Sequence, residues 1–159
     1  CPACPIRDYC AANAGNKQSY YPNKSAAPAK KKIFHYVCIF LFENRYLLVK
    51  RPSSGLLASM WEFPVIEVDK LDKSTHTLEI LVKEKYKISG KILLIGENFR
   101  HHYTHLDLSY KPVLAGVEIA PAFFTEELEY AWCAVEEIAN YPVHNAHLKL
   151  LAWIKSLNR

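Results

Sequence analysis

Residues 50–64, KRPSSGLLASMWEFP, decide the fold of this chain. The apolar run IFHYVCIFLF at 33–42 precedes this segment, and a second apolar run, RYLLVKR at 45–51, overlaps its first two residues. Because only Glu43 and Asn44 separate these runs, a two-strand hairpin is predicted. Gly55 begins a loop, and WEFPVIEV at 61–68 is a further strand candidate. The predicted domain therefore starts with a hairpin, a loop opened by a glycine, and a third strand.

The rest of the predicted domain alternates between helical and strand patterns. Ser74 can cap a helix through about Lys87, in which Leu78, Leu81 and Val82 follow helical spacing and Gly90 is the expected stop. Long strands are predicted at 92–103 and 105–119, then a strand around 128–135 and a helix from Asn145 to Leu157. Strands mixed with two helices predict an α+β (mixed α/β) domain over 33–159.

Composition and charge exclude several classes of protein. Half of the 159 residues are apolar and 13% are aromatic, which is too rich for a disordered chain, and no uncharged apolar run reaches 18 residues. Of the net charge of +4, residues 1–32 contribute +5, since six Lys and Arg face Asp8 alone. Residues 13–32 hold two Pro, five Lys and almost no large aliphatic side chain, and we interpret them as a basic linker.

Three of the five cysteines, Cys1, Cys4 and Cys10, form a C-x2-C-x5-C run in residues 1–12. Thiolates at this spacing suit a soft metal or an iron–sulfur cluster, and a fourth ligand is expected before position 1. Unligated cysteines are the alternative for this chain. Cys38 and Cys133 lie in apolar runs, so the cysteines do not predict a disulfide scaffold and a reducing compartment is expected.

The 50–64 segment and the helix after it resemble the Nudix fold, in which a glycine-led loop and an acidic helix gather carboxylates around magnesium. Val65-Ile66 stand where that pattern has Gly-Gly, and of its acidic set only Glu84 is present, between Lys83 and Lys85. One carboxylate cannot hold a divalent ion that bridges phosphates. The resemblance therefore implies a Nudix-like α/β/α sandwich with a mixed sheet, without the hydrolase site.

Two histidine-containing segments offer other sites. The segment FRHHYTH at 99–105 could bind a metal, could be a strand end with solvent-facing histidines, or could contact nucleic acid. In the last case Arg100 and His101 approach phosphates, Tyr103 stacks, and the Thr104 hydroxyl donates or accepts. His144 and His147 have H-x2-H spacing, which a polar helix start explains more simply than a metal.

Taken in order, these features resemble the C-terminal part of the A/G-specific adenine DNA glycosylases, the MutY family. The family motif C-x6-C-x2-C-x5-C makes Cys1, Cys4 and Cys10 the second to fourth ligands of a 4Fe-4S cluster in the full-length protein. The resemblance implies base-excision repair of adenine mispaired with 8-oxoguanine in double-stranded DNA. It assigns catalysis to an amino-terminal helical domain, so no catalytic residue is predicted in this chain.

The resemblance also names the residues that would recognise the lesion. Tyr103, Thr104 and His105 stand where many relatives have Phe-Ser-His, and Arg100 and His101 precede them. The linker offers candidate phosphate contacts at Lys24, Lys30, Lys31 and Lys32. The simpler alternative is that these lysines are only part of a solvated linker. Arg51 is a candidate for a phosphate contact or for a fold-stabilising contact.

The expected partners are 8-oxoguanine:A duplex DNA, the amino-terminal glycosylase domain, and repair proteins that dock on the linker, with no membrane. If the source is bacterial, a cytoplasmic, nucleoid-associated protein is expected. Two other functions stay open from the sequence. One is a Nudix-type hydrolase of a damaged nucleotide, and the other is a protein-docking module that does not catalyse a reaction.

Overall fold

The computed structural model describes residues 1–23, 29–118 and 129–157. The predicted hairpin is confirmed as β1 (Lys31–Phe42) and β2 (Arg45–Lys50), with Leu41 opposite Tyr46. Glu43 and Asn44 between them both have positive φ, 44° and 60°, as the tight two-residue turns that suit twisted hairpins require. The turn chemistry and the apolar runs thus agree on this pair of strands.

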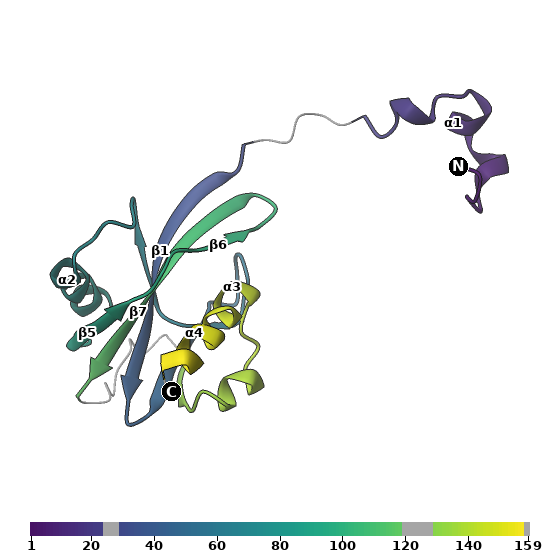
Figure 1. Ribbon diagram of the computed structural model, residues 1–159. Helices are drawn as coiled ribbons and strands as arrows, with labels where there is room; N and C mark the ends of the chain where they lie inside the picture. Colours follow the sequence, from purple (N-terminus) through teal and green to yellow (C-terminus); the bar gives the residue numbers. More distant parts are fainter. Residues whose placement is uncertain (24–28, 119–128, 158–159) are drawn as a thin grey trace.

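Within the described residues eight strands form one mixed sheet, whose main order is β3-β2-β1-β7-β5; β1, β7 and β5 are labelled in Figure 1. The long central pair is parallel, β1 with β7 (Leu106–Val117), in register from Lys31 opposite Leu106 to Leu41 opposite Gly116. Three strands join at the sides: β4 pairs with β1, β6 with β7 and β8 with β2. The remaining strands are β3 (Trp61–Glu62), β4 (Val65–Val68), β5 (Gly90–Ile95), β6 (Phe99–His102) and β8 (Tyr130–Cys133).

Helices cover both faces of the sheet, so the predicted sandwich is confirmed (Figure 1). On the face we call the α2 face, α2 (Thr75–Tyr86) packs Leu78 and Val82 against alternate residues of β1 such as Phe40. On the opposite α3 face, α3 (Asn145–Leu148) and α4 (Leu150–Leu157) pack over the other β1 side chains, such as Ile39. A short 3-10 helix, η3 (Glu137–Asn140), precedes them.

The helix capped by Ser74 is confirmed, since the Ser74 hydroxyl accepts the Thr77 N–H at 3.2 Å. The expected stop at Gly90 is wrong. The helix ends at Tyr86 and is capped by Lys87, which has a left-handed φ of 57°, and Gly90 is instead the first residue of β5. The helix predicted from Asn145 to Leu157 is present with a turn at Lys149 between α3 and α4.

Two predicted strands are each divided by a proline. WEFPVIEV becomes β3 and β4, with Phe63 and Pro64 between them. The strand predicted at 92–103 becomes β5 and β6, because both pair with β7 on either side of Pro112, which has no N–H for the ladder. Gly96 bridges the gap by donating its N–H to the Pro112 carbonyl at 2.8 Å.

The amino-terminal segment contributes nothing to the sheet. Residues 1–23 hold three short turns of helix without buried residues: η1 (Arg7–Tyr9), α1 (Ala11–Ala14) and η2 (Gln18–Tyr20). The end of the strand predicted to reach Ile119, the start of that predicted from Leu128, and Lys24 lie outside the described residues. No helix in the described ranges combines the length and apolar character needed to cross a membrane.

Candidate nucleic-acid interface

The turn Tyr103–His105 joins β6 to β7 at one end of the sheet (Figure 1). The Tyr103 N–H donates to the Leu106 carbonyl at 2.9 Å, and this bond closes the turn. Thr104 and His105 are exposed, and Tyr103 is half-buried. The Thr104 hydroxyl and the His105 ring of the predicted recognition loop therefore face solvent, where duplex DNA can reach them.

The end of the linker lies beside this turn. Lys30 Nζ donates to the Tyr103 carbonyl at 2.8 Å, and the Lys31 N–H donates to the His105 carbonyl at 3.2 Å. The β1–β7 register then sets Lys32 opposite Asp107. Structure thus brings together two groups of predicted contact residues that lie 73 positions apart in sequence.

Tyr103 also forms one wall of a cavity of about 260 Å³ on the α3 face. Its ring meets His101 edge-on, with centroids 4.5 Å apart. Across the cavity stand Leu56 and Leu57 from the loop between β2 and β3. The loop of the 50–64 segment and the β6–β7 turn, predicted separately, therefore enclose one space.

Arg51 holds that loop to the sheet. Its Nη1 donates to both Glu62 carboxylate oxygens, at 2.9 and 2.7 Å, and its Nε donates to the Leu56 carbonyl at 3.1 Å. Gly55, at φ 91°, allows the chain to turn back between these contacts. Of the two roles predicted for Arg51, these bonds support the fold-stabilising one.

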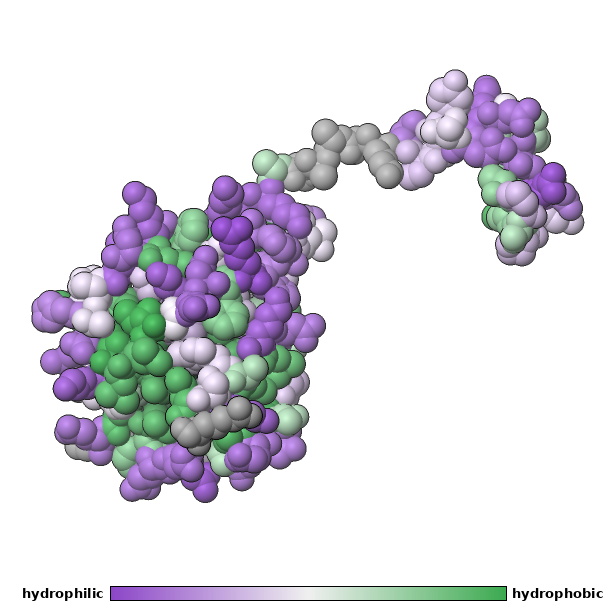
Figure 2. Space-filling view, in the orientation of Figure 1, coloured by the Kyte–Doolittle hydropathy of each residue, from purple (hydrophilic) through white to green (hydrophobic). Residues whose placement is uncertain are grey.

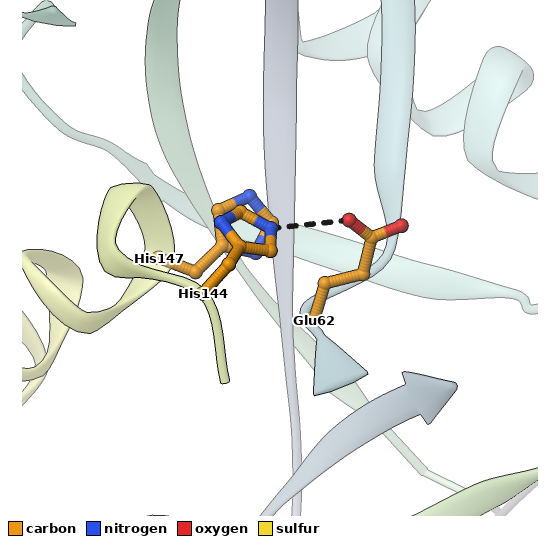
Figure 3. A group of neighbouring side chains, drawn as sticks. All are labelled: Glu62, His144 and His147. Carbon is orange, nitrogen blue, oxygen red and sulfur yellow. Dashed lines mark hydrogen bonds and ion pairs between the residues drawn. The ribbon is translucent and has the colours of Figure 1, made fainter. Parts of the chain in front are cut away.

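Glu62, His144 and His147 also line this cavity. They form a buried polar cluster, in which the His144 ring faces the Glu62 carboxylate (Figure 3). His144 Nε2 lies 3.2 Å from Glu62 Oε2, and His147 Nδ1 accepts the Phe63 N–H at 3.1 Å. Burial raises the pKa of Glu62, but hydrogen bonds from His144 and Arg51 outweigh it and hold that pKa below its ordinary value. Burial, and then the charge of His144, lowers the pKa of His147 well below its ordinary value.

Candidate ligand atoms of these three side chains lie within 4.8 Å of one another, so we tested the cluster as a metal site. His147 Nδ1 accepts a hydrogen bond, so in the neutral ring the proton is on Nε2. Coordination at Nδ1 would break the bond to Phe63, and coordination at Nε2 would require an imidazolate. Arg51 already occupies both Glu62 oxygens. With these bonds in place, the cluster is a hydrogen-bond network.

This cluster was not predicted from the sequence. His144 and His147 were explained by a polar helix start, but their residues are only 5% and 1% exposed. The signal lay in their neighbours, since Glu62 stands between Trp61 and Phe63, and His147 lies among the apolar side chains of the last helix. A polar group in such surroundings is buried and needs a partner.

The other predicted site residues lie elsewhere. Cys1, Cys4 and Cys10 are in the amino-terminal turns, the first two exposed, and all three are free thiols. Glu84 is exposed on α2 and belongs to no group of three metal-ligating side chains found among the described residues. Among the described residues, Glu84 therefore has no neighbouring ligands that would complete a magnesium site.

Comparison with known proteins agrees with this geometry. The sequence profile of the NUDIX domain matches residues 35–153. The adenine DNA glycosylase of Mus musculus is 33% identical over 109 residues, and that of Arabidopsis thaliana is 29% identical over 132 residues. These alignments cover 65% and 67% of this chain but 20% and 21% of the relatives, so the chain spans about a fifth of their length.

A solved structure shows the same fold. It is the complex between the C-terminal domain of mouse MUTYH and human PCNA. The mouse domain superposes with a TM-score of 0.62 at 23% identity, covering 79% of this chain and 89% of that one. The resemblance to adenine DNA glycosylases that the sequence motifs indicated is confirmed by these relatives.

Proposed function

From the premise that the chain belongs to the NUDIX domain family, we propose that it is the lesion-recognition portion of an adenine DNA glycosylase. The whole enzyme would remove adenine mispaired with 8-oxoguanine or guanine in base-excision repair. One observation carries the proposal. In a NUDIX domain whose relatives include adenine DNA glycosylases, Thr104 and His105 are exposed on a turn that lies between basic residues from the linker and from β6.

The chemistry of the turn suits the altered base. Guanine presents an acceptor at N7, whereas 8-oxoguanine presents an N7–H donor and an O8 acceptor. The Thr104 hydroxyl accepts from N7–H, while a neighbouring backbone N–H donates to O8. Undamaged guanine would leave these groups mispaired, at a cost of about 1 to 3 kcal/mol. Tyr103 would stack beside the lesion, and His105 would support the turn or a phosphate.

A Nudix-type hydrolase of a damaged nucleotide is the weaker candidate. Such a site needs several carboxylates around a divalent cation. On α2, Glu84 stands between two lysines, and Glu79 accepts the Ile92 N–H at 3.1 Å. These two carboxylates do not form a metal-ligating group in the described structure.

In the longer protein, Cys1, Cys4 and Cys10 would supply three of the four thiolates of a 4Fe-4S cluster. The donor chemistry fits, since such clusters are held by Cys thiolates, but three are one short of the four required. The catalytic acids that the resemblance assigns to an amino-terminal helical domain are not among these 159 residues. We therefore expect this chain alone to release no adenine.

Repair partners form a further part of the proposal. The similar mouse domain was solved in complex with human PCNA, which supports a repair protein as a partner of this chain. The linker at 13–32 is the expected docking segment, because its composition leaves it without a core of its own.

Binding to two duplexes tests the proposed function. The chain should prefer an 8-oxoguanine:A duplex over a G:A duplex, and Thr104→Val should reduce this preference by about tenfold, which corresponds to about 1.4 kcal/mol. Tyr103→Ala should weaken binding to both. Thr75→Val, which removes an exposed hydroxyl at the start of α2, is the matched control and should bind as the parent does.

Two results would overturn the proposal. One is an unchanged preference in Thr104→Val together with unchanged binding of both duplexes by Tyr103→Ala. The other is magnesium-dependent release of pyrophosphate from a nucleoside triphosphate, which would restore the hydrolase candidate.

A further inference from the structure

The basic residues around the Tyr103–His105 turn divide into two groups, because side chains alternate between the faces of a sheet. Along β1, Phe40 belongs to the core of the α2 face and Ile39 to that of the α3 face. Continuing the alternation places Lys32 on the α2 face and Lys31 on the α3 face. Two consecutive lysines therefore point to opposite sides of the sheet.

Arg100 joins Lys32 on the α2 face. Its neighbour Phe99 packs against the α3-face core, so Arg100 points the other way. The cross-strand pairs agree, since Arg100 lies opposite Ser109, and Ser109 lies opposite Phe34, two residues after Lys32. Helix α2 leaves this end of the face open, and within the described residues Phe34 belongs to neither core cluster.

Lys149 joins Lys31 on the α3 face. Lys149 follows α3, and its Nζ donates to the Arg100 carbonyl at 3.2 Å. This bond holds Lys149 beside β6. Lys31 lines the cavity with Tyr103. His101 is also on this side, but burial and then Lys149 lower its pKa, so its ring is neutral near pH 7. The two lysines thus carry the positive charge here.

Carboxylates also lie near these basic residues. Asp107 lies opposite Lys32 in the β1–β7 register, and His102 Nδ1 lies 2.9 Å from its Oδ1. Glu67 and Asp69 line a pocket with Lys31 and Lys32, and Glu67 also lies 3.9 Å from His35 Nε2. Hydrophilic side chains dominate the end of the domain from which the linker leaves (Figure 2). Among the described residues, the cations near the turn are therefore Lys32 and Arg100 on the α2 face, Lys31 and Lys149 on the α3 face, and Lys30, which bonds the Tyr103 carbonyl.

The dimensions fit a groove of duplex DNA. A sheet with its side chains is about 10 Å thick, and the major groove is about 12 Å wide. The N7 edge that distinguishes 8-oxoguanine lies in that groove. We propose that the β6–β7 hairpin enters the major groove edge-on, with Lys32 and Arg100 contacting phosphates of one strand and Lys31 and Lys149 those of the other. This inference rests on the function proposed above and adds which residues meet which strand.

Strand-selective removal of phosphate charge tests the proposal. The 159-residue chain is titrated onto 8-oxoguanine:A duplexes with uncharged methylphosphonate linkages beside the mispair in neither strand, in one strand, or in the other. Two double variants are compared, Lys32→Gln/Arg100→Gln and Lys31→Gln/Lys149→Gln. Lys83→Gln/Lys91→Gln, which removes two exposed lysines from α2 and β5, is the control with the same change of charge.

Each test variant should lower the slope of log K against log salt by about 1.8, since each lost phosphate contact removes ~0.9. Each variant should bind the unmodified duplex more weakly than the parent does. This difference should vanish on the duplex whose neutral linkages are in the strand that the replaced residues contact, and it should persist on the other duplex. The two variants should therefore respond to opposite strands. The control should keep the parent slope.

The possible failures are distinguishable. If both variants respond to the same strand, or if neither slope changes while the parent still prefers the lesion duplex, the two-strand arrangement is wrong and the proposed function stands. If the parent itself shows no preference for the lesion duplex, the proposed function fails with it.

Discussion

Replacing Glu62 by Gln is the most direct test of the buried network formed by Glu62, His144 and His147. Glu62→Gln keeps the shape of the side chain and removes its negative charge. The carboxylate accepts three hydrogen bonds, two from Arg51 Nη1 and one from His144 Nε2. In the variant the Arg51 cation would remain beside a neutral amide, and one oxygen acceptor would be replaced by an amide donor.

The expected loss follows from these three bonds. A hydrogen bond to a charged group contributes about 1.5 to 3 kcal/mol and a neutral one about 0.5 to 1.5, so each bond loses about 1 kcal/mol of the free energy of unfolding. The Arg51 side chain is 28% exposed and that of Glu62 11%, and screening at Arg51 reduces the sum. We expect a loss of about 2 kcal/mol, which lowers the Tm of a chain of this size by about 4 to 8 °C.

The assay is urea unfolding at a series of pH values. The pKa of Glu62 is lowered in the folded chain, so its stabilisation is fully present above the unfolded pKa of about 4.3 and is lost as the pH falls through the lower folded pKa. The difference between the parent and Glu62→Gln should therefore shrink between pH 5 and pH 3. Glu84→Gln, on the exposed side of α2, is the control and should stay within about 0.5 kcal/mol of the parent.

Two outcomes would refute the reasoning. The first is a Glu62→Gln variant within about 0.5 kcal/mol of the parent at pH 7, which would mean that the network contributes nothing to folding. The second is a loss that stays constant on acidification, because the stabilisation would then not come from the charge of the carboxylate.

Three further perturbations probe the described fold. Because burial keeps the pKa of His147 below 6.5, the unfolded chain takes up a proton first, and stability should fall below pH 6.5 by up to about 1.4 kcal/mol per pH unit. His147→Asn should flatten that decline in urea midpoints, and an unaltered decline would contradict the assignment. Gly96→Ala should cost about 1 to 3 kcal/mol, since a Cβ there would lie 2.6 Å from Pro112 Cγ, and an unchanged Tm would disprove this close approach. Burial raises the pKa of Cys38 to about 12 and of Cys133 to about 11. In a timed thiol-labelling assay these two cysteines should therefore react only after denaturation. Rapid labelling of either one in the folded chain would count against its burial.

Local sequence patterns predicted the elements that depend on local chemistry. The turn at Glu43 and Asn44 and the cap at Ser74 were predicted because adjacent residues determine them. The apolar run at 33–42 predicted a strand, and the structure shows both of its faces covered. The divisions at Pro64 and Pro112 were missed because a proline interrupts a strand only where its partner needs an N–H, and the partner is not visible in the sequence.

The candidate site was predicted in pieces. The turn residues Tyr103, Thr104 and His105 were chosen from their chemistry and from the family resemblance, and the structure exposes the last two. The contact of Lys30 with Tyr103 joins segments 73 positions apart, and that of His144 with Glu62 joins segments 82 positions apart. Such contacts depend on strand pairing, which one sequence without relatives does not determine.

The pairing of β1 with β7 decides which lysine faces which side of the turn. Because side chains alternate, a slip of one residue would exchange the faces of Lys31 and Lys32 and move every buried β1 side chain to the wrong core. The register runs from Lys31 opposite Leu106 to Leu41 opposite Gly116, and both faces of the strand are packed along most of it. A slip would therefore cost the burial of several large side chains, each about 1.5 to 3 kcal/mol. The cores that hold the domain together thus also fix the charges beside its recognition turn, although none of those charged side chains takes part in the packing.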